Sequence, residues 1–232
     1  MTICLVDNAI SAWLLAGMTT TRILLVRHGT TEFNTRGIYQ GQLDSPLTQE
    51  GVQQPQALAP RIHALKSCVT LYSSDLGRAR HTAQLIADMQ HHGLTEDADL
   101  GERNFGIFQG LVKSEIPQRF PEQWALHQSG DPDYVIPEGE SQRQLLERVI
   151  AAVDRIADRH VGELVVGVTH GGVLGAFTQY ALGLDVSAPR RFEVGNSSLS
   201  QFYLDGAHGW KVRFFGDQGH LAKLPEAHQA EG

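Results

Sequence analysis

The sequence predicts an α/β fold, a three-layer α/β/α sandwich built on a mostly parallel central sheet. Two observations lead to this fold class. Apolar segments of strand length alternate along the chain with amphipathic segments of helix length, which is typical of a parallel sheet with helices on both faces. Several expected strands also end in polar residues followed by glycine or a helix, as strands do at the functional edge of such a sheet.

The first half of the chain supplies two strands and two helices. The segment "RILLVRH" (22–28) is a buried strand because aliphatic residues fill it, and "CVTLYSS" (68–74) is a second strand. A helix begins near Thr48, whose side chain suits a helix N-cap, although two prolines lie inside the segment. Another helix covers 75–89.

The second half begins with a proline-rich stretch, 104–140, which we expect to be an irregular excursion over one edge of the sheet. A helix over 141–160 follows it. The apolar face of this helix consists of Leu145, Leu146, Val149, Val153, Ile156 and Ala157. A third strand covers 162–170, a glycine-opened helix comes directly after it, and a hairpin turning at Asp205-Gly206 ends the fold.

Residues 18–232 are expected to form one domain, because no linker, internal repeat or low-complexity tract divides them, and 232 residues suffice for one sizeable core. Residues 1–17 are interpreted as a disordered extension. Their apolar stretch is too short to span a bilayer, and no Lys or Arg precedes it. A weak export signal is the alternative.

Composition narrows the classes of partner. The net charge of −7, with no basic block, disfavours nucleic acid and anionic membranes as partners. The two cysteines, Cys4 and Cys68, form no CxxC pair, which indicates neither a zinc site nor a disulfide framework and favours a reducing, cytoplasmic location. No cofactor is implied, and no cluster shows metal-ligand spacing. The oligomeric state, a homo-oligomer included, stays open.

Charged and polar groups gather at the ends of three strands. The first strand ends in Arg27-His28-Gly29, the second is followed by Arg78 in the first turn of its helix, and the late strand ends in His170 before two glycines. If these strands are neighbours, two histidines and two arginines meet in one crevice beside helix N-termini. Such a crevice binds an anion.

These residue types suit phosphoryl transfer. Neutral imidazole is a nitrogen nucleophile that can attack phosphorus, while arginines hold the phosphate oxygens and offset their charge. A leaving alkoxide needs a proton, and Glu102 in "LGERNFG" is the candidate carboxylic acid, although three other acidic residues lie close to it in the sequence.

Five motifs, in order, carry a resemblance to a known family: "RHGTTEFN", "GQLDSPLTQEG", "SSDLGRARHTA", "GERNFGIFQG" and "THGGVLG". Together they resemble the histidine phosphatase superfamily, with its phosphoglycerate-mutase-like fold, over roughly residues 22–221. The resemblance implies that His28 is the phosphorylated nucleophile and Glu102 the proton donor. It also implies that Arg27, Arg78 and His170 form the phosphate pocket.

Further residues match the family pattern at the rim of the site. The resemblance implies that Asn34 supports the phosphate pocket and that Gln40 and Gly41 belong to a loop closing beside the substrate. Thr30 departs from the pattern, since Glu or Gln is common after the glycine, but this position is peripheral to the chemistry.

Rival enzyme classes lack their motifs. There is no GxSxG for an α/β-hydrolase nucleophile and no GxxxxGK[ST] for a nucleoside triphosphatase. A catalytically dead scaffold of the same fold would have lost one of the matched residues, and none is lost.

Hydrolysis of a small phosphorylated metabolite and a phosphoglycerate mutase reaction share their first step. Two features favour the phosphatase. The excursion, expected to roof the pocket, has only Lys113 and Arg119 as cations against six acidic residues, and the 68 positions from Glu102 to His170 are fewer than the mutase branch carries. The mutase stays as the alternative. The aromatic residues of the excursion are expected mainly to pack it onto the core, and histidines outside the motifs, such as His127, to be solvated.

Overall fold

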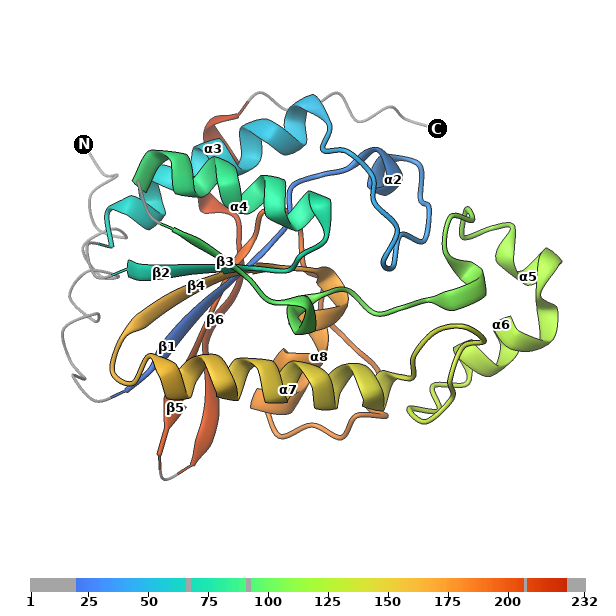
Figure 1. The fold of residues 1–232 in the computed structure, drawn as a ribbon. Coiled ribbons are helices and arrows are strands. Elements are labelled where there is room, and N and C mark those ends of the chain that lie inside the picture. Colours follow the sequence, from blue (N-terminus) through green and yellow to red (C-terminus); the bar gives the residue numbers. More distant parts are fainter. Residues whose placement is uncertain (1–19, 66–67, 91–92, 207, 225–232) are drawn as a thin grey trace.

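A computed structural model of the chain describes residues 20–65, 68–90, 93–206 and 208–224. Its core is a six-stranded sheet with strand order β3-β2-β4-β1-β5-β6 (Figure 1). The strands are β1 (Arg22–Arg27), β2 (Cys68–Ser73), β3 (Leu94–Glu96), β4 (Leu164–Thr169), β5 (Leu199–Asp205) and β6 (Gly209–Asp217). The first four are mutually parallel, β5 runs antiparallel to β1, and β6 runs antiparallel to β5. The predicted, mostly parallel sheet is confirmed.

Helices cover both faces of this sheet. Helices α3 (Gln49–His63) and α4 (Gly77–Gln90) lie on one face, and α7 (Gln142–Arg159) and α8 (Gly171–Ala181) lie on the other (Figure 1). Alternate side chains of β1 pack into two different hydrophobic cores, one on each face of the sheet, because successive side chains of a strand point to opposite faces. Leu24 packs with α3 and α4, whereas Leu25 packs with α7 and α8. This is the predicted three-layer sandwich.

The strand register brings the three polar strand ends together. β4 lies between β1 and β2, and Arg27 pairs with Thr169 while Ser73 pairs with Val168. The residues that follow, His28, Ser74 and His170, therefore leave the sheet side by side. The condition that these strands be neighbours, on which the predicted crevice depends, is met.

Close approach of α3 explains the glycine that follows His28. Thr48 caps α3 by accepting a hydrogen bond from the Gly51 N–H. The carbonyl of Gly51 lacks a helical donor four residues on, because that position is Pro55. A Cβ on Gly29 would collide with this carbonyl oxygen. The free Gly51 carbonyl opposite Pro55 thus faces the loop after β1, and the glycine at position 29 lets that loop pass beside α3.

The stretch 104–140 is more ordered than predicted. It contains a 3₁₀ turn, η2 (Gly106–Phe108), and two short helices, α5 (Ile116–Arg119) and α6 (Pro121–Gln128). Prolines at the first turns of α5 and α6 are compatible with helix, which is why proline content misled the sequence prediction. A separate small core, Phe108 with Ile116 and Ile136, holds the stretch together, and the surrounding aromatic residues pack on it as expected.

The remaining elements are small. They are α2 (Glu32–Thr35), η1 (Ala98–Leu100) and η3 (Gly219–Lys223), and neither these nor the three-residue β3 were predicted. The hairpin β5–β6 is present where it was expected. The proposed extension, 1–17, lies outside the described residues. None of the described helices combines the length and apolarity needed to cross a membrane.

Candidate active site

The structure brings the predicted histidines and arginines together at the carboxyl edge of the sheet. His28 follows β1, His170 follows β4, and Arg78 lies in the first turn of α4. Their exposed fractions are 3%, 0% and 2%, so all three are buried polar groups. The ring centroids of the two histidines are 5.2 Å apart.

Hydrogen bonds orient the His28 ring. Its Nδ1 lies 2.8 Å from the Gly29 carbonyl oxygen, which can only accept, so Nδ1 carries the proton. Nε2 therefore presents a lone pair, and Arg78 Nε donates to it over 3.3 Å. Burial and the nearby cations Arg78 and Arg27 hold the pKa of His28 well below 6.5. The ring is neutral at pH 7, with its unprotonated nitrogen facing the site.

His170 is held in a similar neutral state. Its Nε2 lies 2.9 Å from Ser74 Oγ, at the end of β2. Burial, followed by the charge of Arg78, keeps the pKa of His170 well below 6.5. Its Nδ1 is buried and has no hydrogen-bond partner among the described residues. A buried ring nitrogen without a partner is costly, and a phosphate oxygen could satisfy it.

The two arginines differ in how they are held. Arg78 donates to the Leu43 carbonyl over 2.8 Å and to the Gly41 carbonyl over 2.6 Å, which fixes the predicted loop against the site. Arg27 donates to the Val194 carbonyl through Nη1, while its buried Nε has no hydrogen-bond partner among the described residues. This cluster of cations and neutral rings suits a bound anion.

Glu102 lies at the same edge, beside the N-terminus of α8. Its Oε2 accepts from the Gly172 N–H over 3.0 Å, and its Oε1 accepts from the Arg103 N–H over 2.8 Å. A Cβ on Gly172 would collide with Oε1, so the second glycine of "THGG" lets the carboxylate reach the helix N-terminus. Three other acids lie near Glu102 in the sequence, but the fold brings Glu102 close enough to Arg27 for its charge to raise the pKa of Arg27.

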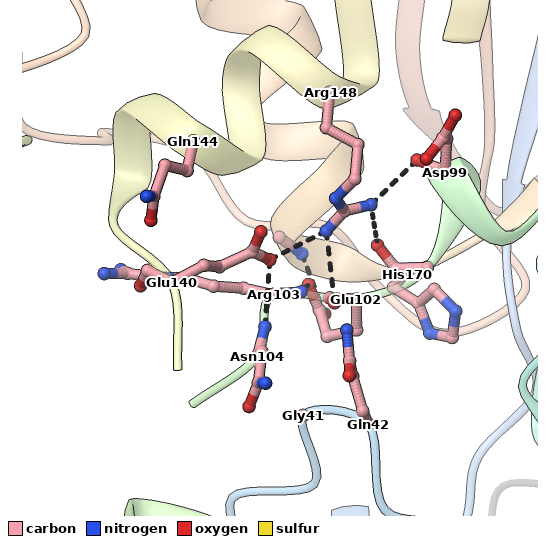
Figure 2. Close-up of polar contacts among 12 residues, drawn as sticks. Gly41, Gln42, Asp99, Glu102, Arg103, Asn104, Glu140, Gln144, Arg148 and His170 are labelled. Carbon is pink, nitrogen blue, oxygen red and sulfur yellow. Dashed lines mark hydrogen bonds and ion pairs between the residues drawn. The ribbon is translucent and has the colours of Figure 1, made fainter. Parts of the chain in front are cut away.

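Arg148, which the sequence analysis missed, holds the segment that carries Glu102. From α7 its Nη1 donates to the carbonyls of Asp99 (2.8 Å) and Gly101 (3.0 Å), and its Nη2 donates to the Glu102 carbonyl (3.4 Å) (Figure 2). Nη2 also forms an ion pair with Glu140 at 2.7 Å. The Glu140 carboxylate accepts from the Asn104 N–H at 2.9 Å, so the segment is fixed on both sides of Glu102.

The rim residues take supporting positions. Asn34 Oδ1 accepts hydrogen bonds from the Thr31 backbone and side chain and from Asn196, whose Nδ2 also donates to the His28 carbonyl. Gln40 is buried, and its Oε1 has no partner among the described residues. Thr30 turns toward α3 and hydrogen-bonds Gln54, which fits a peripheral role.

A cavity of about 680 Å³ adjoins this cluster at Arg27 and Glu102, whereas His28, Arg78 and His170 do not line it. Arg27, Glu102, Gly171 and Gly172 line its inner end, and the beginning of α7 and the loop after α8 line its sides. The excursion contributes Phe105 and the end of α6, as a wall over the site would. The volume lies in the range of ligand pockets, about 300–1,000 Å³, and exceeds what a phosphate alone needs.

Two expectations about the excursion are wrong. His127 is half-buried rather than solvated. It packs against Phe108 and Trp124 and lines the cavity, and burial lowers its pKa to about 4. The second is the argument from the six acidic residues of the excursion, which favoured the phosphatase if the excursion roofs the pocket, because none of these residues lines the cavity. The only acid in the lining is Glu102, whereas Arg27, Arg103 and Arg190 contribute three guanidinium groups.

Sequence signals for the missed residues were weak. Arg103 adjoins Glu102 but resembles any surface arginine, and Arg148 and Arg190 lie outside the motifs, 46 and 88 positions along the chain from Glu102. Only the fold brings them to the site. Among the described residues, no group of three or more His, Cys, Asp or Glu side chains is placed to hold a metal ion.

Comparison with models of known protein families shows which family the chain belongs to. The family model of the histidine phosphatase superfamily (branch 1) matches residues 23–218. The chain belongs to this superfamily. The match spans all five motifs and every strand except the first residue of β1, so the resemblance predicted from the motifs is confirmed.

Similar members of the histidine phosphatase superfamily carry both mutase and phosphatase names. The Arabidopsis thaliana "Phosphoglycerate mutase-like protein 4" is 39% identical over 201 residues, 86% of each chain. Bacillus stearothermophilus YhfR is 31% identical with a TM-score of 0.79, covering 87% of this chain and 99% of its own. A mycobacterial glucosyl-3-phosphoglycerate phosphatase is 27% identical with a TM-score of 0.75, covering 84% and 98%.

Proposed function

We propose that this protein is a phosphomonoesterase that hydrolyses a small phosphorylated metabolite through a phosphohistidine intermediate on His28. One observation carries the proposal. The Nδ1 proton of His28 is bonded to the Gly29 carbonyl, which leaves the Nε2 lone pair facing the guanidinium of Arg78 in a buried site. A neutral, oriented imidazole beside two arginines supports nucleophilic attack on a bound phosphate.

The proposed reaction has two steps. Arg27, Arg78 and His170 bind the phosphate oxygens, with Asn34, Gln40 and Gly41 supporting this pocket. His28 Nε2 forms a bond to phosphorus as the bond from phosphorus to the leaving oxygen breaks, and Glu102 gives that oxygen its proton. A water molecule then attacks the phosphohistidine, Glu102 takes up a proton from it, and inorganic phosphate and free His28 result.

Hydrolysis and phosphoryl transfer to a second hydroxyl differ only in the acceptor. The small number of positions along the chain from Glu102 to His170, fewer than in the mutase branch, favours hydrolysis. A cavity much larger than a phosphate also favours it, because water can enter beside a small substrate. The phosphoglycerate mutase alternative is favoured by the guanidinium groups of the cavity wall, which suit a second anion. A non-catalytic phosphate-binding scaffold is the remaining alternative.

Phosphoryl trapping tests the proposal. The protein is incubated with ³²P-labelled phosphomonoesters, phosphoglycerate among them, and quenched in alkali, which preserves a phosphohistidine. We expect label on the wild-type protein, none on His28→Ala, and release of the label as inorganic phosphate. Recovery of the label in an isomeric phosphoglycerate would establish the mutase. Phosphate binding without protein labelling or turnover would establish the scaffold.

A further inference from the structure

We propose that Gln54 is a positioning residue for the nucleophile: through the peptide group that follows Gly29, it keeps the proton of His28 on Nδ1 and so leaves Nε2 free to attack phosphorus. The inference rests on the proposed phosphohistidine reaction and adds to it a residue of α3 that lies outside the phosphate pocket. It starts from the hydrogen bonds around the acceptor of the Nδ1 proton.

A single peptide group connects His28 with Gln54. Its carbonyl oxygen, that of Gly29, accepts from His28 Nδ1 over 2.8 Å. Its N–H, that of Thr30, donates to Gln54 Oε1 over 2.9 Å. The group is trans and planar, so its C=O and N–H point in opposite directions. Whatever fixes the direction of the Thr30 N–H therefore also fixes the direction of the Gly29 carbonyl.

The glycine at position 29 makes such an anchor necessary. A Cβ there would collide with the Gly51 carbonyl oxygen of α3, so no larger residue fits. Glycine adopts a wide range of backbone angles, and its own sterics therefore restrict the following peptide group little. The Gly29 N–H donates to Thr82 Oγ1 over 3.0 Å, but that N–H belongs to the preceding peptide group. The orientation of the acceptor consequently depends on what holds Thr30.

Helix α3 holds Thr30 from two sides. The Thr30 carbonyl accepts from the Thr48 N–H over 2.9 Å, and the Thr30 N–H donates to Gln54. A Cβ on Gly51 would collide with the Thr30 backbone, so glycine there lets the loop lie directly against the helix. Gln54 is only 4% exposed, which keeps water from competing for its amide. Of the two contacts, only that of Gln54 is made to the peptide group that also bonds His28.

The neighbours of the Gln54 amide fix its orientation. A backbone N–H can only donate, so the amide atom that faces Thr30 N–H is the oxygen. The amide nitrogen donates to the Thr30 hydroxyl and to Glu50 Oε1, each over 3.0 Å. A chain of hydrogen bonds thus runs from the Glu50 carboxylate through this amide and the peptide group to the His28 ring. Bonds in such a chain polarise one another, which strengthens the bond of the Nδ1 proton.

The position of this proton decides which nitrogen of His28 is a nucleophile. If the Gly29 carbonyl turned away, the Nδ1 proton would lose its acceptor and the tautomer with a protonated Nε2 would gain population. Nε2 would then have no lone pair for phosphorus, and its proton would face the Nε–H of Arg78. The alternative is that Gln54 only satisfies the Thr30 N–H and stabilises the loop.

NMR on protein labelled with ¹⁵N in histidine measures the tautomer directly. We expect wild type to show a protonated Nδ1 and an unprotonated Nε2 for His28, with a downfield Nδ1 proton that His28→Ala lacks. In Gln54→Leu this proton should move upfield, or the second tautomer should appear. Gln54→Asn should do the same, because its oxygen lies one methylene farther from the Thr30 N–H. Since it keeps an amide at the buried position, it serves if Gln54→Leu fails to fold.

The first turnover of p-nitrophenyl phosphate measures the attack by His28 alone, since nitrophenolate leaves without a proton from Glu102. We expect Gln54→Leu to slow nitrophenolate release in this turnover by about three- to tenfold, the effect of one neutral hydrogen bond. Gln54→Glu should lose less, because a carboxyl oxygen can still accept from the Thr30 N–H. Inhibition by inorganic phosphate should be unchanged, since no hydrogen bond of Gln54 reaches the phosphate pocket.

The matched control is Gln84→Leu. Gln84 is an exposed glutamine of α4, and its amide likewise donates to an acid of its own helix, Asp88, over 2.6 Å. This variant should leave the His28 tautomer, the first-turnover rate and the phosphate inhibition unchanged.

Two results would overturn the role of Gln54. One is a His28 Nδ1 proton that keeps its chemical shift in folded Gln54→Leu and Gln54→Asn. The other is a loss of first-turnover rate matched by an equal loss of phosphate affinity, which would leave Gln54 as a residue that only stabilises the loop. Failure of the phosphohistidine proposal looks different, because the wild-type protein itself would then release no nitrophenolate and carry no label.

Discussion

Arg78 Nε donates a hydrogen bond to His28 Nε2 over 3.3 Å, from a guanidinium whose other nitrogens are bonded to backbone carbonyls of the 41–43 loop. A protonated Nε2 could not accept this bond. The contact therefore requires the neutral ring and places its lone pair beside a cation that can bind a phosphate oxygen. Loop, cation and nucleophile candidate form one hydrogen-bonded unit, from which several expectations can be tested.

Removal of the His28 ring should abolish phosphate release while the protein stays folded. We expect no turnover above background for His28→Ala, because no other nucleophile lies among the converging strand ends. Circular dichroism and thermal melting check the fold. His81→Ala, which removes an exposed histidine of α4, is the control. Substantial turnover in a folded His28→Ala protein would contradict the assignment.

Activity should survive exhaustive chelation. Arg27, Arg78 and His170 offer enough donors to offset the phosphate charge, so the proposed reaction needs no divalent ion. Phosphate release is measured after prolonged dialysis against EDTA, with and without added Mg²⁺, Mn²⁺ or Zn²⁺. Loss of activity that one of these ions restores would count decisively against this expectation.

Glu102→Gln should slow alkyl phosphate hydrolysis far more than p-nitrophenyl phosphate hydrolysis. An alkoxide needs a proton in order to leave, and general acid catalysis is worth about 10²–10⁴ in rate, whereas nitrophenolate leaves without help. The comparison uses kcat/KM for both substrates with wild type and variant. Equal losses of kcat/KM on both substrates would mean that Glu102 only stabilises its loop and does not protonate the leaving group.

Arg148→Met should reproduce the leaving-group pattern of Glu102→Gln in weaker form. Losing the bonds to the Gly101 and Glu102 carbonyls lets the carboxylate shift, and a small misplacement of a catalytic group can cost about tenfold or more in rate. The matched control is Arg155→Met, which breaks ion pairs with Asp97 and Asp99 from the same helix but removes no hydrogen bond or ion pair to residues 101–104. If Arg148→Met and Arg155→Met each lowered kcat/KM equally for alkyl phosphates and for p-nitrophenyl phosphate, Arg148 would only stabilise the fold.

Acid should destabilise the fold partly through His127. Its pKa is about 4 in the folded protein because of burial and of the charges of Arg103 and Lys113, against 6.5 in the unfolded chain. The unfolded state therefore binds more protons below about pH 6.5, and the free energy of unfolding falls as the pH drops toward 4. Urea denaturation at pH 7, 6 and 5 should show a smaller decline for His127→Asn than for wild type. Parallel declines would mean that the ring is not buried as described.

The sequence determined the fold class and the core of the candidate site. A run of aliphatic residues located β1, the N-cap residue Thr48 located the start of α3, and the spacing of apolar residues on one face located α7. His28 and His170 could be found because each directly follows an apolar strand, so its position along the chain fixes its position at the sheet edge. Short proline-started helices carry no such period, and α5 and α6 were missed for that reason.

The tertiary structure alone decided what surrounds those histidines. The six acids of the excursion favoured a phosphatase, but the charge of a residue in a sequence does not say which way its side chain faces, and none of these acids lines the cavity. Arg103, Arg148 and Arg190 come from three different parts of the chain, and no local pattern connects them. Arg148 donates to backbone carbonyls, whereas Arg103 and Arg190 line the cavity, and only the long-range packing of α7, α8 and the excursion brings them to these positions.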